Sequence, residues 1–304
     1  MKKITHAVIP VAGFGTRMLP LSKAIPKELL PLGNRPAIHY VVEEAIAAGI
    51  KHIVLVGHAQ KSAIENYFDI NAELDTQLRH KGKDVLADSL NWLPEDVTVS
   101  MIRQGKALGL GHAVLAARPI IGDNDFTVLL PDVVLDPFIT DLSTDNLAFM
   151  ITAFVNDGHS QILVDKVADK EVHKYGIAKL SDSFDGNNNS DAATASQSNR
   201  ADDMSANASF KVAGFVEKPS LADAPSRLAV VGRYVFSNAI FDYLANTTAS
   251  VGGEIQLTDA IDALISQHGV NVTTMRGNSY DAGDMRSYMQ AFIYFAERQL
   301  EADE

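Results

Sequence analysis

The stretch VAGFGTRMLP, residues 11–20, follows a short apolar run, AVIPV at 7–11, near the start of the chain. Apolar, β-branched runs of this length are typical of a buried strand. Gly13 and Gly15 permit backbone conformations with positive φ, so that backbone N–H groups can come close to a ligand. A ligand loop directly after a buried strand predicts an α/β fold, although an ordinary tight turn would also explain two glycines.

Cations gather on the same loop and its continuation. Thr16 supplies a hydroxyl donor, and the Arg17 guanidinium can donate two hydrogen bonds to phosphate oxygens. Lys23 and Lys27 follow within ten residues of Arg17. A solvated surface is the structural alternative for such a run, but its place at a strand end favours a polyphosphate site. The dinucleotide fingerprint and the Gly-Lys-Ser/Thr phosphate loop are both absent, which disfavours NAD enzymes and P-loop kinases.

Strands and helices alternate through the first half of the chain. Apolar runs predict strands at 7–11, 52–57, 97–102 and 126–131, and helical patterns lie at 36–50, 61–69 and 111–121. Pro36 is expected as the first residue of its helix, with Gly49 ending it. This alternation predicts a mostly parallel, doubly wound sheet, in which ligands bind at the carboxyl ends of the strands.

The second half has a looser pattern. Strands are predicted at 160–167, 175–180, 210–219 and 228–236, with helices at about 254–267 and 284–300. Residues 181–209 are rich in Ser, Asn, Asp and Ala, and are expected to form a flexible insertion between two strands. We expect one domain over 1–304, whose pattern changes at about residue 150 and divides it into halves at about 1–150 and about 151–304.

Composition excludes several classes of protein. The 304 residues carry a net charge of −12, which argues against a nucleic-acid binder or a membrane-surface binder. The chain has no cysteine, so disulfides, thiolate catalysis and cysteine metal sites are excluded. A metal site built from oxygen ligands is still open. No apolar run is long enough to span a bilayer, and we expect a cytoplasmic protein.

The loop and the segments after it resemble the sugar-phosphate nucleotidyltransferases. The resemblance covers nearly the whole chain, in the family's order, through GFGTR, KAIPKELLPL, EEAIAAGI, HAQKSAIENYFD, RQGKALGLGHAV, LLPDVVLD, YGIAKL, GFVEKP, VGRYVF, GGEIQLTDAI and YDAGDMRSYMQAF. It implies a Rossmann-like, doubly wound mixed sheet with a small sugar-binding subregion, a nucleotide-binding half at about 1–150 and a sugar-phosphate half at about 151–304. It also implies transfer of a nucleotidyl group to a sugar 1-phosphate with release of pyrophosphate, Mg²⁺ as cofactor, and a homodimer or homotetramer.

The variant KAIPKELLPL is similar to the uridylyl branch of this family. That branch implies UTP and α-D-glucose 1-phosphate as substrates and UDP-glucose as product. A thymidylyltransferase, or another sugar-1-phosphate nucleotidyltransferase, is the alternative within the family. A catalytically inactive nucleotide-binding regulatory protein is the alternative from another class. The presence of every charged candidate argues against inactivity.

The resemblance also implies roles for particular residues. Those assigned to catalysis are Arg17, Lys27 and Lys218. Those assigned to the nucleotide are Ala12, Gly13, Gly15, Thr16, Glu28, Gln104 and Gly109. The sugar is assigned to Gly176 and Glu217, and the metal to Asp132 and Asp281.

Each assignment has a structural alternative. Asp132 could cap a strand end, and Asp281 could form a turn with the alanine and glycine after it. Glu217 and Lys218 could be an ordinary exposed pair, and the stretch around Gly109 could be a plain loop-to-helix turn. The chain also departs from the family's usual Lys-Leu-Gly at 285–287, where it has Met, Arg and Ser. A lysine contact at 285 is therefore lost.

Overall fold

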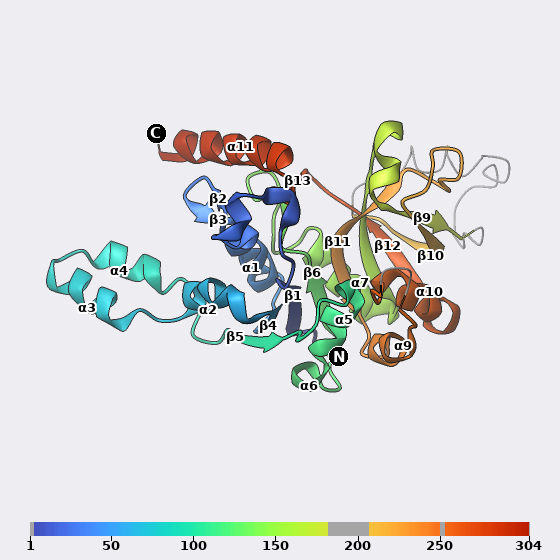
Figure 1. Cartoon of the computed structure of the whole chain (residues 1–304), viewed down its shortest axis with the longest axis horizontal. Coiled ribbons are helices and arrows are strands. Elements are labelled where there is room, and N and C mark those ends of the chain that lie inside the picture. The colour runs from blue at the N-terminus through green and yellow to red at the C-terminus, as the bar shows by residue number, and fades with distance from the viewer. Residues whose placement is uncertain (1–2, 182–206, 250–252, 304) are drawn as a thin grey trace.

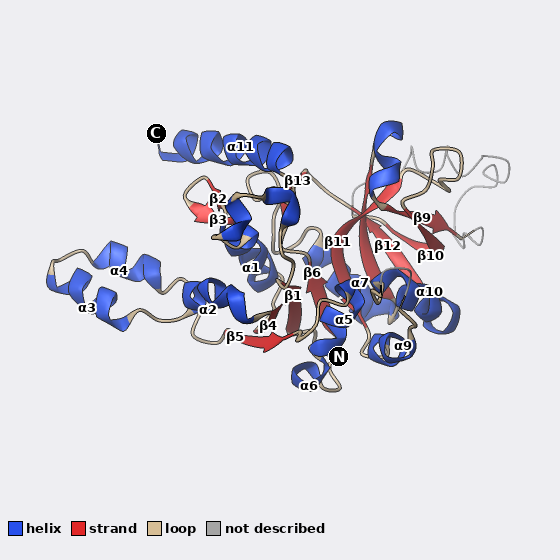
Figure 2. Cartoon of the chain, in the orientation of Figure 1, coloured by secondary structure: helices blue, strands red, loops and turns tan. Residues whose placement is uncertain are grey.

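The computed structural model describes residues 3–181, 207–249 and 253–303. A nine-stranded mixed sheet runs through the molecule (Figures 1 and 2). Across the sheet the strands are β5 (Thr98–Arg103), β4 (His52–Gly57), β1 (His6–Pro10), β6 (Phe126–Leu129), β11 (Leu228–Phe236), β8 (Ser160–Lys166), β12 (Val270–Thr274), β10 (Ser209–Glu217) and β9 (Gly176–Leu180). The predicted insertion falls between β9 and β10, and its residues 182–206 lie outside the described residues.

The first four strands of this order, β5, β4, β1 and β6, are parallel. β1 pairs with β4 on one side and β6 on the other, so the chain reverses its direction of winding at β1. In open α/β sheets this switch point is where ligands bind, beyond the carboxyl ends of the strands. The 11–20 loop follows β1 and therefore lies at this position.

Beyond β6 the sheet is mixed. β11 runs antiparallel to both β6 and β8, whereas β12 is parallel to β8. β10 is antiparallel to β12 and to β9. The mixed sheet that the resemblance implies is confirmed, and it is continuous from β5 to β9.

Helices cover both faces because side chains alternate along each strand. Ile9 and Val11 join one buried cluster, and Val8 joins the other. The first face packs against α1 (Ala37–Ala47), α7 (Leu147–Asp157) and α11 (Met285–Asp303). The second packs against α5 (Gly109–Ala116), α6 (Arg118–Ile121), α9 (Ile240–Asn246) and α10 (Leu257–His268). Over the described ranges, no helix combines the length and apolarity that crossing a bilayer requires.

Several elements were not predicted. They are β7 (Val133–Leu135), β12, β13 (Ser279–Asp281), α3 (Ala72–His80), α4 (Asp84–Leu90), α7 and α9. By contrast, α2 (Ser62–Phe68) matches the helix predicted at 61–69. β12 has the sequence VNVTT and is buried between β8 and β10. Its polar residues do not form the apolar run that would predict a buried strand. α3 and α4 pack mainly on each other and project from the body (Figure 1).

Two predicted boundaries need correction. Pro36 is the N-cap of α1 rather than its first residue, because its extended ψ of 153° precedes the helix. The helix predicted over 111–121 is two helices, α5 and α6, since Pro119 supplies no N–H to continue the first. Short elements complete the fold: β2 (Pro31–Leu32), β3 (Arg35–Pro36), and 3-10 helices η1 (Thr16–Met18), η2 (Leu21–Lys23), η3 (Lys27–Leu29), η4 (Ala59–Lys61) and η5 (Asp169–Lys174).

The small antiparallel pair of β7 and β13 joins distant parts of the chain. Asp281 lies opposite Val133 in this ladder, and Ala282 N donates to Asp132 O at 2.7 Å. The segment that precedes α11 is thereby fixed beside the turn that follows β6.

Candidate active site

The loop after β1 depends on Gly15. This residue has φ 64°, which favours glycine, and it precedes η1. Ser22 Oγ donates to Gly15 O at 2.7 Å, and a Cβ on Gly15 would lie 3.1 Å from Ser22 Cβ. Ala12 is buried, whereas Gly13 and Thr16 are exposed and open to a ligand. The loop is therefore folded back on itself with its outer backbone accessible.

Arg17, Asp132 and Asp281 converge on one point, although they are far apart in sequence. A Cβ built on Gly283 would lie 2.8 Å from Arg17 Nη2, 2.8 Å from Asp281 Oδ1 and 3.1 Å from Asp132 Oδ2. All three side chains thus surround the backbone of Gly283. Two expected metal ligands and one expected phosphate-binding cation are brought together.

Lys27 joins the same group. Its Nζ donates to Asp132 Oδ2 at 2.6 Å. Burial by itself would raise the pKa of Asp132, but the Lys27 ammonium, with help from Arg17, holds that pKa below its ordinary value. Asp132 is therefore ionised at neutral pH and carries the negative charge that a cation needs. Lys23, by contrast, lies exposed in η2.

Asp281 has the opposite shift. Burial raises the pKa of this carboxyl, and the negative charge of Asp132 adds to the effect, while a 2.6 Å hydrogen bond from Gly283 N opposes it. Two carboxylates close together are destabilised by their like charges, and a bound cation would relieve that repulsion. Within the described ranges no cluster of three or more His, Asp or Glu suits a metal. Two oxygen-donor carboxylates fit Mg²⁺, which is usually held by one or two carboxylates plus substrate phosphates.

A second group lies beyond the ends of β4 and β5. Gln104 Nε2 donates to Gly109 O at 3.0 Å and lies 3.2 Å from His112 Nδ1. The structure thus places Gln104 and Gly109 together. Gly109 has φ 91°, and a Cβ there would lie 2.9 Å from Ile255 O. Close packing against the Ile255 backbone therefore requires a glycine at position 109, independently of any contact with a ligand.

Glu28 is buried in η3, with 1% of its surface exposed. Lys61 Nζ donates to Glu28 Oε2 at 2.7 Å, whereas Oε1 is buried with no hydrogen-bond partner. Burial raises the pKa of Glu28, and the Lys61 ammonium opposes that rise. A buried unpaired oxygen is costly, so Oε1 is a candidate acceptor for a ligand N–H.

The sugar-side candidates lie where β9 and β10 pair. Glu217 is opposite Gly176, and a Cβ on Gly176 would lie 3.2 Å from Glu217 Oε2. Lys218 follows β10 with φ 45°, and its N–H donates to Tyr175 O at 3.0 Å. Its Nζ lies 3.6 Å from Glu217 Oε1. A left-handed conformation is unfavourable for lysine, so the surrounding structure must hold this backbone in place.

Two tyrosines near these groups have raised pKa values. Burial raises the pKa of Tyr234, with contributions from the charges of Glu217 and Asp132. Burial likewise raises the pKa of Tyr175, with a contribution from Asp281. Glu217 and Asp132 therefore both lie within electrostatic range of Tyr234, which was not predicted as a site residue.

The departure at 285–287 has a structural role. Ser287 Oγ donates to Asp284 Oδ2 at 2.8 Å, and the N–H groups of Arg286 and Ser287 donate to Asp284 Oδ1. These bonds satisfy the first N–H groups of α11. Met285 and Arg286 thus begin a well-capped helix directly after Gly283.

Sequence reasoning missed Gly283, Lys61, Glu44 and Arg233. Gly283 stands in the quoted YDAGDM, but its importance depends on three side chains from elsewhere in the chain. Arg233 had a visible signal, since it is the one charge in the strand LAVVGRYVF.

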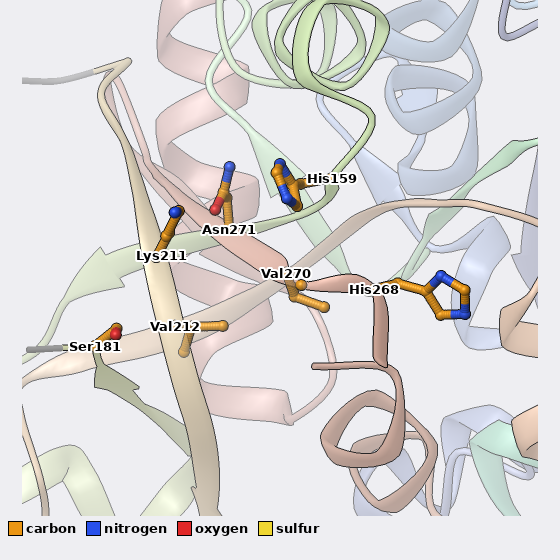
Figure 3. Close-up of a pocket in the computed structure, with 8 residues that line it drawn as sticks. His159, Ser181, Lys211, Val212, His268, Val270 and Asn271 are labelled. Carbon is orange, nitrogen blue, oxygen red and sulfur yellow. The ribbon is translucent and has the colours of Figure 1, made fainter. Parts of the chain in front are cut away.

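A cavity of about 320 Å³ lies elsewhere (Figure 3). It is lined by His159, Ser181, Lys211, Val212, His268, Gly269, Val270 and Asn271. Val270 begins β12 opposite Ser160, which begins the parallel strand β8. β8 and β12 run in the same direction as β1, and the cavity lies at their N-terminal ends. The candidate site lies beyond the carboxyl end of β1, so the cavity and the site are at opposite ends of these strands.

The chain matches the family model described as "Nucleotidyl transferase" over residues 6–298. It is 48% identical over 293 residues to the UTP–glucose-1-phosphate uridylyltransferase of Haemophilus influenzae, covering 96% of this chain and 93% of that protein. A UTP-bound UGPase from Acinetobacter baumannii is similar at 41% identity and a TM-score of 0.82, covering 96% of this chain and 93% of the other. A UDP-glucose pyrophosphorylase complexed with UDP-glucose is similar at 30% identity and a TM-score of 0.77, covering 97% and 99%.

Proposed function

Because the chain belongs to the nucleotidyl transferase family, we propose that it is a UTP–glucose-1-phosphate uridylyltransferase, making UDP-glucose and pyrophosphate from UTP and α-D-glucose 1-phosphate. The relative from H. influenzae has this name, and the similar structure from A. baumannii holds UTP. The observation in this chain that supports the proposal is the convergence of Arg17, Asp132 and Asp281 around Gly283. Cations and carboxylates meet there at the switch point of the sheet.

The reaction needs no covalent intermediate with the protein. A phosphate oxygen of glucose 1-phosphate attacks the α-phosphorus of UTP in line. A bond forms between that oxygen and the α-phosphorus, while the bond from the α-phosphorus to the oxygen bridging the β-phosphorus breaks. The bridging oxygen leaves with pyrophosphate. Because the incoming phosphate is already a nucleophile, the protein contributes positioning and charge neutralisation.

The cations divide this work. Arg17 and Lys27 hold the β- and γ-phosphates, which become the leaving pyrophosphate. Lys218 holds the incoming sugar phosphate, and its constrained backbone supports that role. Glu217 accepts hydrogen bonds from sugar hydroxyls, while Gly176 beside it leaves the backbone open to the sugar.

The base and ribose lie along the loop after β1. Ala12, Gly13, Gly15 and Thr16 present backbone and hydroxyl groups to the nucleotide. The amide of Gln104 and the free Oε1 of Glu28 face the polar edge of uracil, and Gly109 provides a flat surface for the base. The unpaired Glu28 Oε1 supports this assignment, because a uracil N–H would supply its missing donor.

Asp132 and Asp281 would hold the Mg²⁺ ion. When bound, Mg²⁺ supplies positive charge beside the α-phosphate of the nucleotide. Lys27 keeps Asp132 ionised and therefore ready to bind the metal.

The chain forms a single nucleotidyltransferase domain over 1–304, in which about 1–150 bind the nucleotide and about 151–304 bind the sugar phosphate. It assembles as a homodimer or homotetramer. An apolar stripe on α11 supports assembly: Met289, Phe292, Ile293 and Leu300 are 36–68% exposed. A second copy would remove this stripe from water.

The test is release of pyrophosphate from UTP and glucose 1-phosphate with Mg²⁺ present and absent, with dTTP, CTP, ATP and GTP run in parallel. Turnover that requires Mg²⁺ and prefers UTP is the expected result. A preference for dTTP would make the protein a thymidylyltransferase with the same chemistry. Tight UTP binding without pyrophosphate release from any nucleotide would refute catalysis and favour a regulatory protein.

A further inference from the structure

Arg233, on β11, is the largest fully buried side chain of the described residues, with 0% of its surface exposed. Its Nε lies 3.1 Å from both carboxylate oxygens of Glu44, and its Nη2 lies 2.9 Å from Oε2. Glu44 belongs to α1 and is also buried. A buried ion pair is weak evidence for stability, because the loss of solvation offsets the attraction between the charges. The pair therefore calls for another explanation.

The rest of the guanidinium binds the turn that carries Asp132. Arg233 Nη1 donates to Leu130 O at 3.0 Å, and Nη2 donates to Val133 O at 2.7 Å. These two carbonyls lie on either side of Pro131 and Asp132. One planar side chain thus fixes both ends of the turn while Glu44 fixes the guanidinium itself.

Neighbouring backbone contacts hold the turn from two further directions. Leu130 N donates to Gly232 O at 2.9 Å, so the residue before Arg233 binds the same turn. On the other side, Ala282 N donates to Asp132 O at 2.7 Å and links the turn to the segment that carries Asp281 and Gly283. Without Arg233, the carbonyls of Leu130 and Val133 would lose the guanidinium donors in a partly buried setting. Leu130 O would keep only the 3.4 Å hydrogen bond from Val133 N, and the turn would relax.

We propose that Arg233, held by Glu44, is a positioning residue that sets the Asp132 carboxylate at the separation from Asp281 needed to bind a divalent cation with the nucleotide. This inference rests on the proposed metal-binding role of Asp132. Arg233 touches neither substrate nor metal. Its effect passes through the two carbonyls that flank Asp132.

The decisive variant is the double substitution Glu44→Leu with Arg233→Met. Replacing both members by apolar residues of similar volume leaves no buried unpaired charge, so the fold is expected to survive. We expect the Kd for Mn²⁺ in the presence of UTP, measured by titration calorimetry without sugar phosphate, to rise by at least ~10-fold. We also expect kcat/KM to fall by ~10- to 100-fold, as for a small misplacement of a reacting group.

A second variant keeps the test decisive if the double variant unfolds. Arg233→Lys retains a charge opposite Glu44, but a single ammonium cannot serve the carboxylate and both carbonyls with the same geometry. It should give a smaller rise in the Mn²⁺ Kd. The matched control is Leu264→Ala, a fully buried residue of α10 in the other apolar cluster. It should lower thermal stability and leave the Mn²⁺ Kd unchanged.

Wild-type Mn²⁺ affinity and kcat/KM in a folded double variant or in Arg233→Lys would overturn the inference, as would an equal rise in Kd for Leu264→Ala. Failure of the proposed function is distinguishable. In that case Asp132→Asn would bind Mn²⁺ as the wild type does, or the wild type itself would release no pyrophosphate.

Discussion

Gly283→Ala adds a single methyl group at the point where the candidate site converges. Gly283 does not have the positive φ that would strain alanine, so the backbone can accept the change. The new Cβ would lie 2.8 Å from Asp281 Oδ1 and 2.8 Å from Arg17 Nη2, whereas ordinary contacts begin at 3.4 Å. Each atom must therefore retreat by about 0.6 Å. The 2.6 Å hydrogen bond from the backbone N–H of residue 283 to Asp281 Oδ1 would lengthen as the carboxylate retreats.

A displacement of this size acts on activity more than on stability. Misplacing reacting groups by about 1 Å costs on the order of 10²-fold in rate, so we expect kcat/KM to fall ~10- to 100-fold. The free energy of unfolding should change by less than about 1 kcal/mol, because restricting the unfolded chain offsets the local strain. The assay is steady-state pyrophosphate release, with thermal unfolding measured on the same preparations.

The matched control is Gly214→Ala on β10. A Cβ there would lie 3.7 Å from Asp262 Oδ1, an ordinary contact, and its φ is also not positive. This variant makes the same chemical change away from the point of convergence, so its kcat/KM should equal that of the wild type. The reasoning would be refuted if Gly283→Ala kept wild-type kcat/KM, or if Gly214→Ala lost as much.

Three further predictions concern other parts of the molecule. Lys218→Ala should lower kcat by on the order of 10²–10³, because it removes a cation from the incoming phosphate; near-normal kcat in steady-state assays would remove Lys218 from that role. Burial and the Arg35 charge lower the pKa of His39 to about 4, from 6.5. Below pH 6.5 the unfolded state binds a proton at His39, whereas the folded state stays neutral there until the pH approaches 4. The contribution of neutral His39 to the free energy of unfolding is therefore full above pH 6.5 and falls as the pH drops toward 4, by about 2 kcal/mol at pH 5. Urea unfolding should show a smaller loss of unfolding free energy at low pH in His39→Gln than in the wild type. An equal pH dependence in both proteins would contradict this role of His39. Ile293→Glu should shift the sedimentation profile toward monomer while Gln290→Glu does not; a wild-type profile for Ile293→Glu would exclude the α11 stripe as the interface.

Much of the fold was predictable because local pattern and burial agree in the first half of the chain. Runs such as HIVLVG at 52–57 are apolar enough to be recognised, and the structure has a strand at those residues. β12 could not be predicted in the same way. Its polar Asn271 and Thr273 are buried only because β8 and β10 enclose them.

The sequence by itself determined the kinds of groups available: a glycine loop after the first strand, cations on it, and carboxylates at later strand ends. Motifs of this kind depend on residues close together in the chain, so they can be read in one dimension. Only the tertiary structure decided which groups meet. Arg17, Asp132 and Asp281 span most of the chain and converge because β13 pairs with β7 beside the end of β6. The same holds for Arg233 and Glu44, which pair across the core 189 residues apart and fix a turn that neither adjoins in sequence. Pairing between strands that are far apart in the sequence brings such groups together, and no local pattern of residues predicts which distant strands will pair.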